Sequence, residues 1–371
     1  MKIAVVFPYN NPCSQINTRP VVLAGLPYVT YSKWKKDIII FTSYTETPIE
    51  FNNLVIIDKI YNSKKKYNKM VIEQLKQLQI TRVEIHQDCI LASEIKKSIP
   101  TIKVALIKHG EYLINRFQEQ FSLLRKIFYF RYIKHIAEIY CISDFVHNSL
   151  TALYPKIKDR IFTMYNTYGH ISPFLANKDV VEKKSQIIFV GKPLAYKGIE
   201  EFLDSLPMLL SKYPTWTAIV VGAFFSSKSK YVLYFQKLLK KPEIQKLILE
   251  NKLTIMNNLS SQEVFHIMQE STISVIPTKT QEPFGLVAVE SHLAKCAVIS
   301  SGNGGLKEIS GQHASYLDSV GKENIFNAIS LLIENTTKTK MLALLGYNNC
   351  LIKFSPQKLV RLLDDKRQNN A

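Results

Sequence analysis

The residues most suited to chemistry are two glutamates that flank a short apolar run, in the stretch TQEPFGLVAVES near residue 285. Seven residues separate Glu282 from Glu290. We expect a helix to begin at Gly285. Its geometry would place Glu290 on one stripe with Leu286 and Leu293, a face that normally belongs to the core. Because a lone buried carboxylate is costly, the pattern predicts that something pairs with Glu290.

The chemistry open to these residues is recognition of hydroxyl groups and of an anion. Glu282 follows a predicted buried strand, TISVIPT, and its carboxylate can accept hydrogen bonds from ligand hydroxyls. The amides around Phe284, Gly285 and Leu286 can receive an oxyanion at the helix start. Glu290 could accept from two neighbouring hydroxyls, as on a ribose. The alternative for Glu290 is a glutamate that only complements the helix dipole.

Two lysines follow an earlier predicted strand, in the stretch GKPLAYKGIEEF. Gly191 permits a tight turn after this strand. Lys192 and Lys197 supply two cations, and Gly198 opens a helix whose N-terminal amides can also receive an anion. Two cations beside a helix N-terminus would suit a diphosphate. The alternative is that both are ordinary loop lysines in a lysine-rich chain.

Two histidines close predicted strands in the first half of the chain, His86 in RVEIHQD and His109 in KVALIKHGE. Both should therefore lie at the same edge of a sheet, with Asp88 close by. A structural role is the commoner outcome for a single histidine, but two at equivalent strand ends favour a functional site. Gly110 strengthens this interpretation for His109, because it lets the backbone turn tightly beside a ligand.

The elements that position these residues are short apolar runs that alternate with helix-length segments. This rhythm is typical of βα units and predicts parallel sheets. The predicted strands are Ile3–Phe7, Ile38–Thr42, Leu54–Ile57, Arg82–His86, Lys103–Lys108, Glu138–Ile142, Gln186–Val190, Thr217–Val221, Leu253–Met256, Ile273–Ile276 and Ala297–Ser300.

These strands fall into two series, and we expect an α/β protein of two doubly wound, Rossmann-like domains. Residues 169–186 lack a clean period and should form a linker. We place the N-terminal domain at 1–168, the C-terminal domain at 187–350, and a helical segment at 351–371 that packs back on the N-terminal domain. Since ligands bind beyond the carboxyl ends of parallel strands, two such domains facing each other would form one central cleft.

Composition narrows the function classes. The formal net charge of +18 indicates an anionic partner: nucleic acid, a membrane surface or a phosphorylated substrate. The five cysteines form no C-x-x-C pair, and the chain holds no D-x-D triplet, P-loop, H-E-x-x-H or G-x-S-x-G. No apolar run approaches the roughly 20 residues of a membrane span, and the start of the chain does not have the pattern of a signal peptide. We expect a cytoplasmic protein.

Taken together, these motifs resemble retaining glycosyltransferases of the GT-B fold that carry an E-x7-E motif (glycosyltransferase family 4-like). Glu282 to Glu290 is similar to that motif, FVGKPLAYKG to the family's phosphate-binding turn, KHG to its N-domain histidine, and CAVISSGNGGLKEI to the segment after the motif. The resemblance covers essentially the whole chain. It implies transfer of a hexose from a UDP- or GDP-sugar.

The resemblance also implies roles for the site residues. Lys192 and Lys197 would hold the diphosphate, with the amides near Phe284, Gly285 and Leu286. Glu290 would bind the ribose, while Glu282 and His109 would bind the donor sugar, the two catalytic candidates. His86 and Asp88 are candidates on the acceptor side. No metal or cofactor is expected, because fixed cations and helix amides stabilise the leaving group.

Three positions depart from the family pattern. The loop PYNNPCSQ stands where many relatives have a Gly-Gly pair. Lys192 replaces the usual arginine, which gives a point charge in place of a bidentate fork. Asn257 and Asn258 fall where relatives often have glycine near the base.

The positive charge suits an anionic, lipid-linked or oligosaccharide acceptor, at a membrane surface with anionic lipid. The segment FSLLRKIFYFRYIKHIAEIY (Phe121–Tyr140) mixes aromatic with basic residues, as does KKKYNK (Lys64–Lys69). The alternative is a core helix with a solvated basic face. A weaker similarity to lipopolysaccharide core glycosyltransferases suggests an envelope glycan as product. Rival functions are a nucleotide-sugar epimerase of the same architecture, a catalytically silent scaffold and, ranked far below, a nucleic-acid-binding protein.

Overall fold

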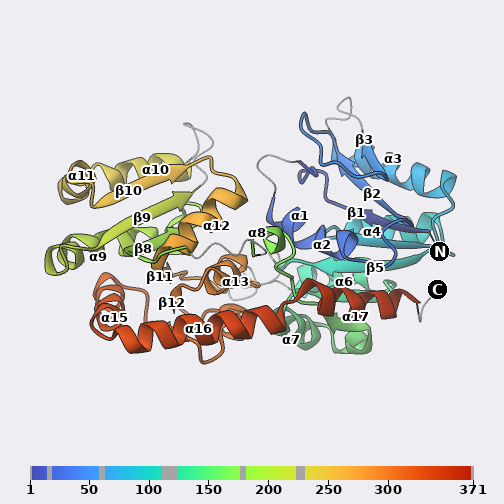
Figure 1. Ribbon diagram of the computed structural model, residues 1–371. Coiled ribbons are helices and arrows are strands. Elements are labelled where there is room, and N and C mark those ends of the chain that lie inside the picture. Colours follow the sequence, from blue (N-terminus) through green and yellow to red (C-terminus); the bar gives the residue numbers. More distant parts are fainter. Residues whose placement is uncertain are drawn as a thin grey trace. The chain divides into compact units, whose positions relative to one another are not determined.

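The computed structural model describes residues 2–14, 19–57, 63–110, 123–175, 181–222 and 230–368. The chain divides into two compact units (Figure 1). Unit 1 consists of Met1–His170 together with Phe354–Ala371, and unit 2 consists of Ile171–Lys353. Each unit has its own parallel sheet and its own hydrophobic core.

The sheet of unit 1 has seven strands in the order β3-β2-β1-β4-β5-β6-β7, and neighbouring strands are parallel. β1, β4 and β6 are buried along their whole length, as expected for strands covered on both faces. The direction of winding reverses between β1 and β4, which makes this the switch point of the sheet. The strands are β1 (Ile3–Val6), β2 (Ile38–Ser43), β3 (Leu54–Ile57), β4 (Arg82–His86), β5 (Lys103–Lys108), β6 (Glu138–Cys141) and β7 (Ile161–Thr163).

Helices connect these strands, and several begin at a side-chain cap. Ser63, Asp88 and Ser143 accept hydrogen bonds from first-turn amides of the helices that follow them. Such caps satisfy amides that have no partner within the helix. The helical elements before the domain boundary are α1 (Pro20–Gly25), α2 (Pro27–Thr30), α3 (Lys64–Gln77), α4 (Cys89–Ser98), α6 (Leu123–Ile133), α7 (Asp144–Leu153) and the 3-10 helix η1 (Pro155–Arg160).

The C-terminal helix α17 (Pro356–Gln368) belongs to unit 1 and contacts α2. Its Arg367 is fully buried and donates to both carboxylate oxygens of Glu84 on β4, at 2.9 and 2.6 Å. Asp364 on the same helix accepts from Arg367 at 2.7 Å and from the Ser32 hydroxyl at 2.7 Å. A buried ionic network therefore ties the end of the chain to the sheet of unit 1.

The sheet of unit 2 has six strands in the order β10-β9-β8-β11-β12-β13, again parallel throughout. Its winding reverses between β8 and β11, so the loops after these two strands lie at the switch point. The strands are β8 (Lys184–Val190), β9 (Thr217–Gly222), β10 (Leu253–Asn257), β11 (Ser271–Ile276), β12 (Ala297–Ser300) and β13 (Ala314–Tyr316).

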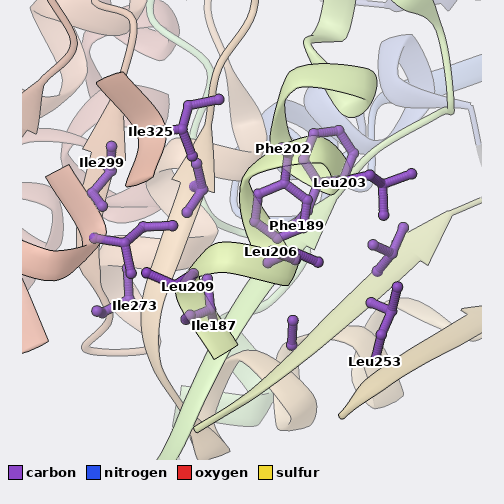
Figure 2. Packing of buried hydrophobic residues seen from close by; sticks show 14 of the residues in the cluster. Ile187, Phe189, Phe202, Leu203, Leu206, Leu209, Leu253, Ile273, Ile299 and Ile325 are labelled. Carbon is purple, nitrogen blue, oxygen red and sulfur yellow. The ribbon is translucent and has the colours of Figure 1, made fainter. Parts of the chain in front are cut away.

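The core of unit 2 forms where α9 packs on its sheet. Phe202 and Leu206 on α9 lie in one buried cluster with Phe189 on β8, Ile273 on β11 and Leu253 on β10 (Figure 2). The helical elements of this unit are α8 (Ser172–Leu175), η2 (Ala195–Lys197), α9 (Ile199–Lys212), α10 (Lys230–Leu239), α11 (Pro242–Leu249), α12 (Ser261–Glu270), α13 (Leu286–Leu293), α14 (Leu306–Ser310), α15 (Lys322–Glu334) and α16 (Thr336–Lys353).

The expectation of two doubly wound parallel sheets is confirmed. Every predicted strand is present, with ends that differ by at most two residues. The sequence pattern does not predict β7 and β13, because three residues at a sheet edge are too few to show a period. None of the helices within the described ranges is long and apolar enough to cross a membrane.

Candidate functional site

The lysine-bearing loop after β8 lies at the switch point of the unit 2 sheet. The turn η2 ends at Lys197, directly before Gly198 and α9. Gly198 has a φ of 74°, and a Cβ at this position would overlap the carbonyl oxygen of Pro277, just after β11. Glycine is therefore needed for the close approach of the two loops. Lys192, earlier in the same loop, is exposed.

Two ion pairs join the loop after β8 to the loop after β11. Lys197 pairs with Glu282. Lys279 pairs with Glu201 in the first turn of α9. The amide of Lys279 also donates to the carbonyl of Tyr196 at 2.7 Å. Unit 2 thus brings together Lys197 and Glu282, two of the residues that the sequence singles out.

The loop after β12 holds the main chain of Glu282 in place. The side-chain amide of Asn303 donates to the carbonyl of Thr278 at 2.8 Å. The main-chain carbonyl of Asn303 accepts from the Glu282 amide at 3.4 Å. The Glu282 carbonyl accepts from the Gly305 amide at 2.7 Å. Gly304 has a φ of 64°, and a Cβ there would overlap that same carbonyl. The loop after β12 therefore fixes the backbone from which the Glu282 carboxylate projects.

Glu290 lies on α13, and of the stripe that the sequence predicts to face the core, Leu293 is buried while Leu286 and Glu290 are only partly so. Leu286 and Glu290 are both half-buried, whereas Ala288, Val289 and Leu293 are buried. The stripe is therefore half-buried at Leu286 and Glu290 and becomes buried at Leu293. Partial exposure places Glu290 where a ligand could reach it.

The start of α13 provides backbone amides next to Glu282. Gly285 is the N-cap residue, with a φ of 110°, and a Cβ there would lie 2.5 Å from a methyl carbon of Leu306. Phe284 is buried at 3% exposure and anchors the turn in the protein interior. Amides in the first turn of a helix have no intrahelical acceptor and attract anions. The site thus combines a carboxylate, a lysine and a helix N-terminus.

His86 and His109 lie together at the carboxyl ends of the neighbouring strands β4 and β5. Nδ1 of His86 and Nε2 of His109 are 2.9 Å apart, and the rings are stacked with centroids 5.2 Å apart. The ring of His86 also stacks on Phe7, with centroids 4.6 Å apart. The backbone amide of His109 donates to the side-chain oxygen of Gln87 at 2.8 Å. His86 therefore holds the ring of His109 through its Nε2.

Burial keeps both rings neutral near pH 7. Burial lowers the pKa of His86 to about 4, although the charge of Glu84 opposes this effect. Burial also lowers the pKa of His109 well below its usual value, and His86 and Lys108 add to the shift. Two neutral imidazoles can share one hydrogen bond, because one nitrogen donates and the other accepts.

Asp88 is occupied within unit 1. One carboxylate oxygen accepts from the amides of Ile90 and Leu91 at 3.2 and 3.1 Å, which caps α4. The other oxygen pairs with Lys64 at 2.7 Å. A structural role accounts for this residue. His86, at 3% exposure, likewise acts within the protein, so neither acceptor-side candidate presents an open polar group.

The basic and aromatic segment that the sequence predicts over Phe121–Tyr140 is described from residue 123 on, with side chains from residue 126. Ile127 and Phe128 on α6 are more than half exposed, and Arg131 is exposed beside them. Tyr129 and Phe130, both half-buried, instead stack on the buried Tyr154. The helix therefore packs two aromatic residues against the protein and exposes apolar side chains beside a basic one.

Sequence reasoning missed several residues that build the site in unit 2, among them Lys279, Glu201 and Asn303. Each acts through a contact between loops that are distant in the chain, and a single sequence gives no signal for such a contact. The sequence does place Lys279 three residues before Glu282, which indicates that it belongs to the same loop but not which residue it contacts. Asn258, directly after β10, has a φ of 56°, a left-handed conformation that asparagine adopts more readily than most residues.

Across the described part of the chain, no group of three or more His, Cys, Asp or Glu side chains could hold a metal ion. Of the five cysteines, Cys13, Cys141, Cys296 and Cys350 are buried free thiols, and Cys89 is half-buried.

Part of this chain is similar to known glycosyltransferases. Residues 173–348 match the family described as "Glycosyl transferases group 1". YtcC of Bacillus subtilis is 20% identical over 266 residues, which cover 67% of this chain and 62% of YtcC. The protein named "Uncharacterized glycosyltransferase MJ1178" of Methanocaldococcus jannaschii is 25% identical, over 49% of this chain and 45% of that protein. The matches to these curated relatives thus span less than two thirds of their length.

The whole fold is shared with solved structures. The Anabaena protein Alr3699/HepE in complex with UDP superposes with a TM-score of 0.75 at 15% identity, and the match covers 100% of both chains. The sucrose-phosphate synthase of Thermosynechococcus elongatus gives a TM-score of 0.77 at 13% identity, over 100% of this chain and 99% of that one. At these identities the likeness establishes the fold alone. The fold is that of two Rossmann-like parallel-sheet domains.

Proposed function

We propose that this chain, whose residues 173–348 match the family described as "Glycosyl transferases group 1", is a retaining hexosyltransferase that uses a UDP- or GDP-sugar. The observation that carries the proposal is the meeting of Lys197, Glu282 and the start of α13 at the switch point of the unit 2 sheet. This is where α/β sheets bind nucleotides. The solved structure of Anabaena Alr3699/HepE with UDP-glucose, which shares the fold, supports this choice of donor.

Each site residue then has a role toward the donor. Lys197 and the exposed Lys192 hold the diphosphate, together with the first-turn amides of α13 at Gly285 and Leu286. Glu290 accepts hydrogen bonds from the ribose, while Glu282 accepts them from the hydroxyls of the sugar. The buried Phe284 fixes the turn between them.

His109 is proposed to donate to a sugar hydroxyl through Nδ1. In this role Nδ1 of His86 donates to Nε2 of His109, so the proton of the neutral His109 ring lies on its Nδ1. His86 is thus a positioning residue for His109. Asp88 fixes the start of α4 beside them.

The chemistry follows from stabilisation of the departing nucleoside diphosphate. The bond between the anomeric carbon and the phosphate oxygen breaks as the acceptor oxygen bonds to that carbon on the same face, and the departing phosphate oxygen takes the acceptor proton. The lysines and helix amides stabilise the negative charge that develops on the phosphate. We propose that no metal is required, so an excess of EDTA should leave the rate unchanged.

Release of nucleoside diphosphate tests this function. A panel of UDP- and GDP-hexoses, offered with saccharide and lipid-linked acceptors, should give release that depends on both donor and acceptor. The variant Glu282→Gln should lower turnover. The matched control is Glu270→Gln, which removes a carboxylate of a surface ion pair with Lys184 in the same unit and should have no effect. A sugar nucleotide that changes into its epimer without any acceptor would instead identify an epimerase.

Product analysis tests the stereochemistry. The anomeric proton coupling in the NMR spectrum of the purified product reports whether the linkage keeps the configuration of the donor. An inverted linkage would contradict the same-face mechanism but not the proposed donor site.

The acceptor is proposed to be anionic and bound to a lipid, as in synthesis of lipopolysaccharide core or a related envelope glycan. The support is the exposed face of α6, where Ile127 and Phe128 adjoin Arg131. Such a face suits shallow contact with an anionic membrane from the cytoplasmic side. Flotation with liposomes that contain anionic lipid should recover the protein, and Phe128→Ser should reduce recovery. Binding that is indifferent to lipid charge would exclude this role.

A further inference from the structure

The ion pair between Lys197 and Glu282 joins two residues that the proposed function assigns to different parts of one ligand. Lys197 is assigned to the diphosphate and Glu282 to the sugar, yet each is the partner of the other in the protein. Their side chains are partly accessible, 29% for Lys197 and 22% for Glu282. The pair therefore lies at the surface of the site and not in the core.

The main chain on both sides of this pair is fixed, so a change of partner needs only side-chain rotation. The amide and the carbonyl of Glu282 bond to Asn303 and Gly305. The amide of Lys197 donates to the carbonyl of Leu194 at 2.8 Å. Rotamer changes of partly exposed side chains occur in picoseconds to nanoseconds, so such an exchange would not limit turnover.

A second link keeps the two loops together when the first opens. Lys279 pairs with Glu201, and its amide donates to the carbonyl of Tyr196 at 2.7 Å. The hydroxyl of Thr278 donates to the same carbonyl at 3.2 Å. Loss of the Lys197–Glu282 contact would therefore leave the site assembled.

We propose that Glu282 is an internal counterion of Lys197, which the donor diphosphate displaces to release the carboxylate for the hydroxyls of the sugar. The inference rests on the proposed function and adds a specificity mechanism to it. A diphosphate carries more negative charge than one carboxylate and so competes well for Lys197. The displaced Glu282 then needs new partners, and the sugar of an intact donor provides them.

The exchange favours the intact donor over the free nucleoside diphosphate. UDP alone breaks the ion pair and leaves Glu282 with water as its partner. A UDP-hexose breaks the same pair but offers hydroxyl donors to the carboxylate. Glu282 thus weakens the binding of UDP, whereas the hydroxyls of a sugar nucleotide offset the lost ion pair, and this difference also assists product release.

Calorimetric titration with UDP and with UDP-glucose tests this mechanism. A partly exposed ion pair stabilises by an amount that corresponds to about a twofold to fivefold change in affinity. Glu282→Gln should therefore bind UDP about twofold to fivefold more tightly than the wild type, and should lose most of the preference for UDP-glucose over UDP. The control variant Glu270→Gln should match the wild type for both ligands.

A double-mutant cycle separates this exchange from a general effect of charge. In the Lys197→Met background, Glu282→Gln should bring no gain in UDP affinity, because no cation remains for the carboxylate to occupy. An equal gain in that background, or an unchanged or weaker affinity for UDP in Glu282→Gln alone, would overturn the proposal. If the wild type binds neither UDP, GDP nor any sugar nucleotide, the proposed function itself fails.

Discussion

Replacement of Arg367 by methionine should destabilise unit 1 while leaving unit 2 intact. The side chain of Arg367 is fully buried and makes five hydrogen bonds: two to Glu84, and one each to Asp364, Ser32 and the carbonyl of Tyr28. Methionine keeps much of the volume but none of these donors. Its introduction would leave two buried carboxylates without their main counterion.

The magnitude follows from what remains around Glu84. Arg82 still donates to it at 2.9 Å, but Arg82 also serves Glu138 at 2.7 Å. Removing one partner of a buried ion pair costs about 3–5 kcal/mol. For a unit of this size, each kcal/mol lowers the melting temperature by about 2–4 °C. We therefore expect unit 1 to melt about 6–20 °C lower.

The two tryptophans of the chain make the assay specific, since Trp34 lies in unit 1 and Trp216 in unit 2. In a Trp216→Phe background, fluorescence during urea unfolding reports unit 1 alone, and in a Trp34→Phe background it reports unit 2. The matched control is Arg361→Met, which removes an exposed arginine from the same helix. A loss in Arg367→Met no larger than in this control, or one seen only at Trp216, would refute the reasoning.

Acid titration of the wild type gives an independent check on the same network. Burial alone would raise the pKa of Glu84, but Arg367 and Arg82 lower it to about 2. A carboxyl whose pKa is lower in the folded state contributes stability above its unfolded pKa of about 4.3. That contribution should be lost as pH falls from about 4.3 toward 2. In Arg367→Met, the free energy of unfolding should fall less over the same pH range, because Glu84 has lost one of the two cations that lower its pKa.

Three further predictions concern the site residues. Gly304→Ala should lower donor affinity at least tenfold, because the new Cβ would overlap the carbonyl of Glu282. The control Gly311→Ala should keep donor affinity, because Gly311 has a similar φ of 54° but a Cβ there would have nothing within 4 Å. Equal donor affinities of the two variants in titration would contradict this. Because His86 stays neutral in the folded protein down to about pH 4, stability should fall by at most about 1.4 kcal/mol per pH unit on its account as pH drops from about 6.5 to 4. Urea unfolding of His86→Asn should show a smaller slope, and an identical slope would refute the assignment. In steady-state kinetics, Glu290→Gln should mainly raise KM for the donor and Glu282→Gln should mainly lower kcat, so identical effects would contradict the division of roles.

The sequence predicts the fold well because parallel strands carry a strong local signal. Apolar runs such as those at β4 and β5 are recognisable alone, and the helix start at Gly285 follows from its flanking pattern. The short edge strands β7 and β13 depend on pairing with a neighbour, which leaves no local trace.

The site is predicted in part for the same reason. Lys197 and Glu282 follow adjacent strands, so their proximity follows from the topology. Their direct ion pair, the support from Asn303 and the occupation of Asp88 by Lys64 depend on side-chain geometry between distant segments. The burial of α13 is decided by the elements that pack around it, so its sequence alone does not reveal that Glu290 is only half-buried.

Equilibrium dialysis with radiolabelled sugar nucleotides tests most directly whether unit 2 binds the donor at this site. We expect saturable binding of a UDP- or GDP-hexose to the wild type, with at least tenfold lower affinity in Lys197→Met. The control Lys184→Met, which removes a surface lysine of the same unit, should keep the wild-type affinity. Absence of binding to the wild type, or equal binding to Lys197→Met, would contradict this expectation.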